Sequence, residues 1–136
     1  MGKVSFTSNW NGKLCSDVFT TIRPYNYEKY PDFQKFEIEL KNRGVLGIAE
    51  LVAKKGFTAN NLNDITSLVD CGHERDYLYK LLKSFYPDMT GEMTFYLLVF
   101  KWVERHPEAT ERLFKERYEK IAESYKEINP HQPELF

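Results

Sequence analysis

Residues 36–40 read Phe36-Glu37-Ile38-Glu39-Leu40 and alternate strictly between apolar and acidic side chains. Successive side chains of a strand point to opposite faces of its sheet, so one face here is apolar and the other carries two carboxylates. Arg43-Gly44 then supplies turn residues, and residues 45–53 form a further apolar stretch. The segment predicts two half-buried strands joined by a turn.

Further strands are expected on both sides of this pair. Lys3–Thr7 and Phe19–Arg23 mix β-branched and aromatic residues, and Pro24 ends the second because it cannot donate to a ladder. Residues 93–103 are apolar on both faces, which predicts a central strand covered on both sides.

Helices are expected in three stretches. Asn61 caps a short helix that ends at Val69, and a second helix follows through Phe85. Glu108 to Asn129 forms a long amphipathic helix between Pro107 and Pro130. Strands followed by helices, one more strand and a last helix indicate an α+β fold. We expect residues 1–105 to form one domain, with residues 106–136 as a helix and tail packed on it.

Composition excludes several classes of protein. The 136 residues carry 19 basic and 20 acidic side chains, so there is no overall positive field for a long nucleic acid. The longest apolar run, residues 95–100, is far shorter than the roughly 20 residues of a membrane-spanning helix. Two cysteines without paired spacing indicate neither a disulfide framework nor a zinc ribbon. We expect a soluble cytoplasmic protein without a membrane partner.

Cations and aromatic residues gather near the expected strand ends. Lys13 and Arg23 lie close in sequence to Trp10 and Tyr25, a mixture that binds phosphate by charge and a base by stacking. The alternative to a binding site is that these cations are scattered over the surface and that the aromatic side chains belong to the core. Glu50 is expected on the same face as Leu46, Ile48 and Val52, where it either accepts hydrogen bonds from a base edge or pairs with a nearby cation.

Asp70 has two alternative roles. It acts as a general acid or base if a cleft desolvates it, or it caps the second helix. Cys71 and His73 beside it are too few ligands for a structural metal site, so we expect no metal there. No dinucleotide fingerprint, phosphate loop or nucleophile elbow is present, and no cofactor is indicated.

The last helix carries an apolar stripe that could pack on the domain or form the seam of a homodimer. Successive members of the stripe are four, three, four and three residues apart: Phe114, Tyr118, Ile121, Tyr125 and Ile128.

Several segments between residues 3 and 103 together resemble the ASCH family. They are Val4-Ser5-Phe6, Phe19-Thr20-Thr21-Ile22-Arg23, Gly44 to Val52, Asp70-x-Gly72 and Phe95 to Trp102. The resemblance implies a PUA-like fold, a small, mostly antiparallel closed β-barrel with interposed helices, to which the last helix is an addition. It also implies an association with RNA and modified nucleosides.

The family commonly reads Gly-x-Lys-Thr-x-Thr-x-Arg, with its Lys and the Thr nearest the Arg facing a cleft. Thr21 and Arg23 match this pattern, whereas the Lys position falls on Val18 and the next Thr position on Phe19. One branch hydrolyses the amide of acetylated cytidine with that Lys, the Thr and a carboxylate, for which Asp70 is the candidate. A valine can neither attack nor transfer a proton, so Lys13, earlier in the same loop, is the candidate substitute amine.

Two functions therefore stay open. The first is a module that binds RNA, a nucleotide or a nucleoside through Trp10, Lys13, Thr21, Arg23 and Glu50. The second is a hydrolase acting on acetylated cytidine or on RNA, with Thr21, Asp70 and Lys13 as its catalytic residues. Both require these side chains to open onto one cavity.

Overall fold

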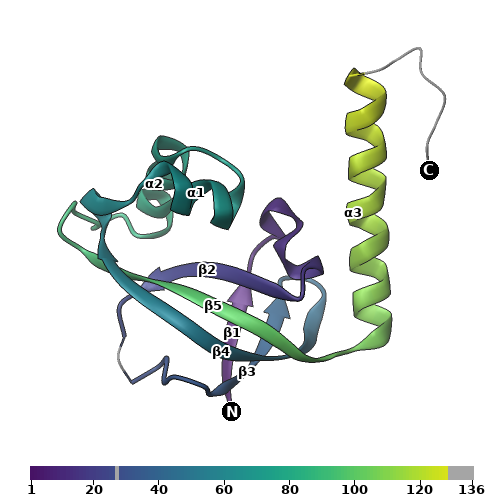
Figure 1. The fold of residues 1–136 in the computed structure, drawn as a ribbon, viewed down its shortest axis with the longest axis horizontal. Coiled ribbons are helices and arrows are strands. Elements are labelled where there is room, and N and C mark those ends of the chain that lie inside the picture. The colour runs from purple at the N-terminus through teal and green to yellow at the C-terminus, as the bar shows by residue number, and fades with distance from the viewer. Residues whose placement is uncertain (27, 129–136) are drawn as a thin grey trace.

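One curled, five-stranded sheet forms the body of the computed structural model, which describes residues 1–26 and 28–128 (Figure 1). The strands are β1 (Gly2–Phe6), β2 (Val18–Pro24), β3 (Lys35–Leu40), β4 (Gly44–Thr58) and β5 (Thr94–Arg105). Their order in the sheet is β1-β3-β4-β5-β2, with β1 parallel to β3 and every other pair antiparallel. The fold is an α+β half-barrel, and the α+β prediction is confirmed.

The alternating stretch forms β3, as its pattern predicts. Phe36, Ile38 and Leu40 are buried in the core, while the two glutamates between them lie partly in solvent. The turn after Leu40 leads into β4, which pairs antiparallel with β3 and continues five residues beyond the expected end, to Thr58.

Irregular pairing along β4 changes which side chains face the core. Ile38 pairs with Gly47 but Glu39 pairs with Val45, so Leu46 is an extra residue, and the ladder with β5 shifts again after Ile48. Each extra residue reverses the alternation that follows it. Ala49 and Leu51 are fully buried, whereas Ile48, Glu50 and Val52 share the opposite, half-buried face as expected; Leu46 is buried and does not share that face, so this part of the prediction is wrong.

The expected closed barrel is also corrected. β1 and β2 are the two edges of the sheet, and the described residues form no backbone ladder between them. Side chains span the opening instead: the Phe6 and Phe19 rings meet edge to face at 6.0 Å, and Arg23 Nη2 donates to the Ser5 carbonyl at 2.7 Å. The short 3-10 helix η1 (Trp10–Cys15) follows β1 and contacts β2, α1 and α3. This helix therefore lies where β1 and β2 would have to pair to close the barrel.

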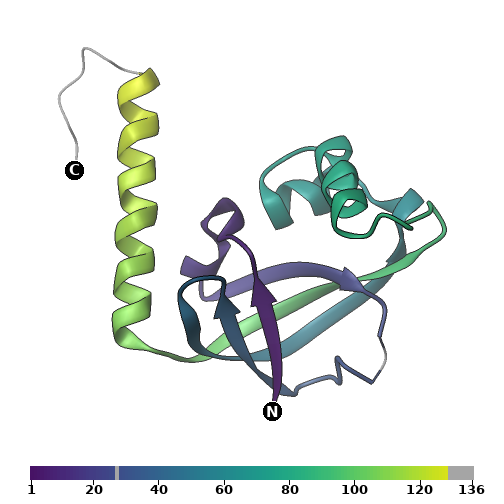
Figure 2. The ribbon, with the colours of Figure 1, turned by 180° about the vertical axis from the view of Figure 1, so that it is seen from behind.

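Two helices cover one end of the sheet. After the 3-10 turn η2 (Ala59–Asn61), α1 (Asp64–Cys71) and α2 (Arg75–Phe85) form a hairpin above β2, whereas α3 (Pro107–Ile128) stands at the other end (Figures 1 and 2). The cap of α1 is Asn63 rather than the expected Asn61, because the Asn63 side chain accepts a bond from Thr66 N at 2.8 Å. Gly72 ends α1 in the left-handed conformation, at φ 79°.

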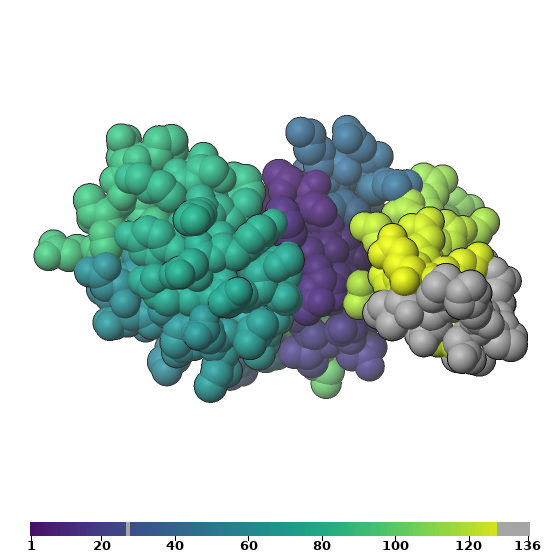
Figure 3. Space-filling view, turned by 90° about the horizontal axis from the view of Figure 1, so that it is seen from above, coloured from purple at the N-terminus to yellow at the C-terminus, as the bar shows by residue number. Residues whose placement is uncertain are grey.

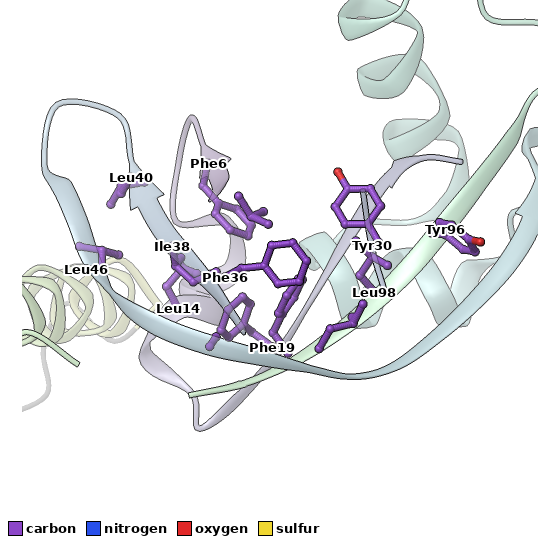
Figure 4. Packing of buried hydrophobic residues seen from close by; sticks show 14 of the residues in the cluster. Phe6, Leu14, Phe19, Tyr30, Phe36, Ile38, Leu40, Leu46, Tyr96 and Leu98 are labelled. Carbon is purple, nitrogen blue, oxygen red and sulfur yellow. The ribbon is translucent and has the colours of Figure 1, made fainter. Parts of the chain in front are cut away.

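The core has two parts. One lies within the curled sheet and is rich in aromatic rings, among them Phe6, Phe19 and Phe36 (Figure 4). The other lies between the α1–α2 hairpin and the adjoining strand ends, around Leu62, Leu82 and Phe95. Within the described ranges, no helix is long and apolar enough to cross a membrane.

The last helix contacts the domain through a narrow face. Leu113 is buried at 6% exposure and Ala109 packs beside it, but neither belongs to the predicted stripe. Phe114, Tyr118 and Ile121 of that stripe are 43%, 53% and 41% exposed. The expected helix end at Asn129, Pro130 and the tail through residue 136 lie outside the described residues. A homodimer seam along the stripe stays a prediction.

Candidate functional site

A cavity of about 260 Å³ opens between the free edges of the sheet, beneath the α1–α2 hairpin. Its lining comes from five separate elements, namely the ends of β1 and β2, η1, α1 and α2. Its polar residues are Ser5, Thr7, Lys13, Thr21, Arg23 and Asp70, and its aromatic residues are Phe6, Trp10, Phe85 and Tyr86. Figure 3 shows the N-terminal segment, in purple, between the α1–α2 hairpin in teal and α3.

Lys13 reaches the cavity from η1. Asn11 and Gly12 have φ values of 55° and 63°, and this left-handed turn precedes the lysine. The side chain is almost completely buried, and Nζ donates to Asp70 Oδ1 and to the Thr20 carbonyl oxygen, both at 2.8 Å. Burial removes water from the ammonium group and lowers the pKa of Lys13, although the charge of Asp70 partly opposes this shift.

Asp70 lies in the last turn of α1 and is 5% exposed. Its Oδ1 atom accepts from Lys13 and also from Thr20 Oγ1 at 2.8 Å. Asp70 is therefore not the cap of the second helix, where the N-cap is Glu74. The carboxylate instead joins the helical hairpin to β2 and η1.

Thr21 and Arg23 form the second polar group of the cavity. Arg23 Nε donates to Thr21 Oγ1 at 3.0 Å, and the guanidinium carbon lies 4.9 Å from the centre of the Phe6 ring. Burial lowers the pKa of Arg23 from its ordinary value. No carboxylate of residues 1–26 and 28–128 forms an ion pair with this guanidinium, whose polar partners are the neutral oxygens of Thr21 and Ser5.

Aromatic rings supply the flat walls of the cavity. Phe6 is buried, Trp10 and Tyr86 are half-buried, and Phe85 is 48% exposed at the rim. Tyr25, the other ring expected to stack on a base, packs against Tyr96 with 4.8 Å between centroids and does not line the cavity.

Glu50 lies away from the cavity. Its register neighbours are Lys35 of β3 and Lys101 of β5, and it points to the face opposite the buried Ala49 and Leu51. Of the two roles predicted for Glu50, a position beside nearby cations therefore fits the structure better than a position facing the cleft. Four of the five polar residues expected to converge, Lys13, Thr21, Arg23 and Asp70, do line one cavity.

Thr20 belongs to the segment Thr20-Thr21-Ile22-Arg23 that the sequence indicates, but it is not among the predicted site residues. Its side chain and its carbonyl oxygen contact Asp70 and Lys13 respectively, whereas simple alternation would place Thr20 and Thr21 on opposite faces. Val18, at the position where the ASCH pattern has lysine, is 47% exposed and outside the cavity, and Phe19 lies in the core.

Cys71 lines the cavity beside Asp70, whereas His73 does not. His73 is exposed and stacks on Tyr77 at 4.0 Å, while Cys71 is buried and contacts Ser67. In the described part of the chain, no three His, Cys, Asp or Glu residues are grouped so that they could hold a metal ion.

Comparison with known proteins identifies a fold but no function. No family model matches the sequence, and no curated protein matches it. Among solved structures, the crystal structure of protein EF3133 from Enterococcus faecalis V583, of the family DUF984, is similar with a TM-score of 0.59. The alignment covers 82% of each chain at 15% sequence identity, so the shared feature is the small α+β half-barrel.

Proposed function

We propose that this domain binds a nucleoside or a single nucleotide in the cavity between β1, β2 and the α1–α2 hairpin. The observation that carries the proposal is that Lys13, Thr21, Arg23 and Asp70 share one cavity with Trp10 and Tyr86. Polar groups between aromatic walls suit a ligand that has hydrogen-bonding edges and a flat face.

The size of the cavity narrows the choice of ligand. A volume of about 260 Å³ is slightly below the usual range for small-molecule sites, which favours a single base with its sugar. The net charge of −1 provides no extended basic surface, so any contact with RNA is expected to involve one base that enters the cavity. The resemblance to the ASCH family points to the same class of ligand.

Tryptophan fluorescence offers a direct test because the chain has two tryptophans and only Trp10 lines the cavity. In a Trp102→Phe variant, Trp10 is the sole reporter, and titration with a nucleoside and nucleotide panel should change its emission saturably. The matched Trp10→Phe variant keeps Trp102, which packs on Phe19 and should not respond. Equal responses from both variants, or none from either, would argue against binding in this cavity.

Hydrolysis is a second candidate, favoured by the state of Lys13. A buried amine with a lowered pKa, bonded to a carboxylate, has the properties of a catalytic base or nucleophile. In this proposal Lys13 replaces the lysine that the ASCH pattern would place at Val18, with Asp70 as its proton partner and Thr20 or Thr21 beside it. The resemblance suggests acetylated cytidine as the substrate.

Turnover separates this candidate from simple binding. Concentrated protein should release acetate and cytidine from acetylated cytidine, and both Lys13→Met and Asp70→Asn should reduce the rate by at least about a hundredfold. An RNA oligomer in the same assay tests cleavage of the strand. If both substrates survive intact, the hydrolytic proposal is rejected while the binding proposal stands.

A further inference from the structure

Among the described residues, two cations and one carboxylate line the cavity. Lys13 and Asp70 bond to each other at 2.8 Å, so their charges offset locally. Arg23 lacks such a partner within the described ranges and gives the lining an excess of one positive charge. Arg23 is half-buried, and a partly desolvated cation without a counter-charge has a cost that a ligand with a negative charge would reduce.

The guanidinium of Arg23 is held in place before any ligand enters. Its Nε bonds to Thr21, its Nη2 to Ser5, and its face lies on the Phe6 ring. A guanidinium has five N–H donors, and these two bonds leave others for a ligand. A fixed planar group of this kind suits an oxyanion, which it can bind through two parallel hydrogen bonds.

Two tyrosine hydroxyls accompany this guanidinium. Tyr86 lines the cavity, and both Tyr86 and Tyr30 are close enough to Arg23 to influence its pKa. Tyr30 is only 3% exposed, and in Figure 4 its hydroxyl points away from the strands beneath it. Neither hydroxyl bonds to another described residue, but of the two only Tyr86 lines the cavity.

The Arg23 group is separate from the Lys13–Asp70 pair. Thr20 bonds to that pair, whereas Arg23 bonds to Thr21 and Ser5. The two cations lie at one Phe6 ring, with Lys13 Nζ at 5.9 Å and the Arg23 guanidinium carbon at 4.9 Å from its centre. A mononucleotide likewise has two distinct polar groups, the edge of its base and its phosphate.

From these observations we infer that the cavity prefers a ligand carrying a phosphate, and that Arg23 and Tyr86 bind this group. The inference rests on the proposed function and names its ligand class: a nucleoside monophosphate rather than a nucleoside. The Lys13–Asp70 end is then left to the base or the sugar.

Isothermal titration calorimetry can test the inference with paired probes. The four common ribonucleosides and their 5′-monophosphates form one set, and phenol with phenyl phosphate forms a second set without a base or sugar. Each phosphate ester should bind about tenfold tighter than its uncharged counterpart, or better. Arg23→Gln should abolish that advantage, and Tyr86→Phe should reduce it. Arg112→Gln and Tyr77→Phe, at exposed positions on α3 and α2, should leave it unchanged.

The outcomes separate this inference from the proposed function. If a nucleoside binds as tightly as its monophosphate, the phosphate site is rejected and nucleoside binding remains. If phenyl phosphate binds through Arg23 but no nucleotide does, the anion site remains and the proposed function fails. A tetranucleotide without terminal phosphates should bind more weakly than the monophosphates, and tighter binding would assign the phosphate to an RNA strand and overturn the mononucleotide preference. Failure of every phosphate ester to bind would reject the site outright.

Discussion

Lys13 Nζ lies 2.8 Å from Asp70 Oδ1, and the two side chains are only 7% and 8% exposed. The pair connects η1 to α1 across 57 residues of sequence, and Thr20 of β2 bonds to both partners. The α1–α2 hairpin is thus joined to the open edge of the sheet at the wall of the cavity. This arrangement makes one ion pair important for both stability and the site.

A double-mutant cycle should show strong coupling between these residues. Lys13→Met and Asp70→Asn each leave the other group buried without its partner, and each should lower the free energy of unfolding by about 3–5 kcal/mol. The double variant should lose much less than the sum of the two. The exposed pair Lys3–Glu39 is the control, and the same cycle there should give a coupling of about 1 kcal/mol or less. Additive losses at Lys13 and Asp70 in urea unfolding would contradict the coupling.

The titration of Lys13 should be displaced toward lower pH. Burial lowers its pKa below the ordinary value of 10.5, the charge of Asp70 raises it, and Arg23 lowers it. NMR of the lysine side chains should therefore place the Lys13 midpoint below 10.5 in the wild type, lower still in Asp70→Asn, and closer to 10.5 in Arg23→Gln. The signal is assigned by its absence in Lys13→Met. A midpoint that does not move in Asp70→Asn would show that the pair is not formed in solution.

The same shift fixes the sign of the pH dependence of stability. Between the folded pKa of Lys13 and 10.5, the unfolded chain binds more protons than the folded chain. The contribution of Lys13 to the free energy of unfolding should therefore rise with pH across that interval. Below the folded pKa both states are protonated, and the contribution should not change with pH.

Local patterns predicted the elements of this fold well. The alternation of residues 36–40 fixed both the strand and its buried face, and helical spacing located α2 and α3. Whether the barrel closes could not be predicted in this way, because closure depends on whether β1 pairs with β2. The sequence of each segment predicts a strand but does not show whether the two strands pair. Leu46 was wrongly placed on the face of Glu50 because the extra residue in β4 reverses the alternation between them, and no residue type marks an extra residue reliably.

The site was predictable in its members but not in its connections. The sequence predicted two cations, a hydroxyl group and an acid near strand or helix ends, namely Lys13, Arg23, Thr21 and Asp70. Their pairing required coordinates, since Lys13 and Asp70 are 57 residues apart in the sequence. The aromatic wall from α2 was missed because Phe85 and Tyr86 fit the pattern of an ordinary helix end.

Gly47 should be the glycine least tolerant of substitution in β4. Its φ is 153°, and a Cβ there would collide with the backbone carbonyl of Glu104 on β5. Gly47→Ala should destabilise the domain by more than about 3 kcal/mol, because backbone strain and a steric clash add together. Gly44→Ala is the matched control: its φ is 75° but no atom lies near the added Cβ, so only about 1–2 kcal/mol is expected. Equal losses in thermal or urea unfolding would show that β4 and β5 do not approach closely at Gly47.

Neighbouring residues of α3 should differ sharply in their effect on stability. Leu113 is buried against the first core, and its substitution by Ala should cost about 2–5 kcal/mol, as expected for the loss of a packed side chain. Phe114 is 43% exposed, and the guanidinium carbon of Arg105 lies 5.8 Å from the centre of its ring. Phe114→Ala should therefore lower the free energy of unfolding by less than about 1 kcal/mol, although its side chain is larger than that of Leu113. Chemical denaturation at low protein concentration, with solution mass measured in parallel, tests both. A larger loss for Phe114→Ala accompanied by a fall in mass would mean that the exposed stripe is buried against a second copy.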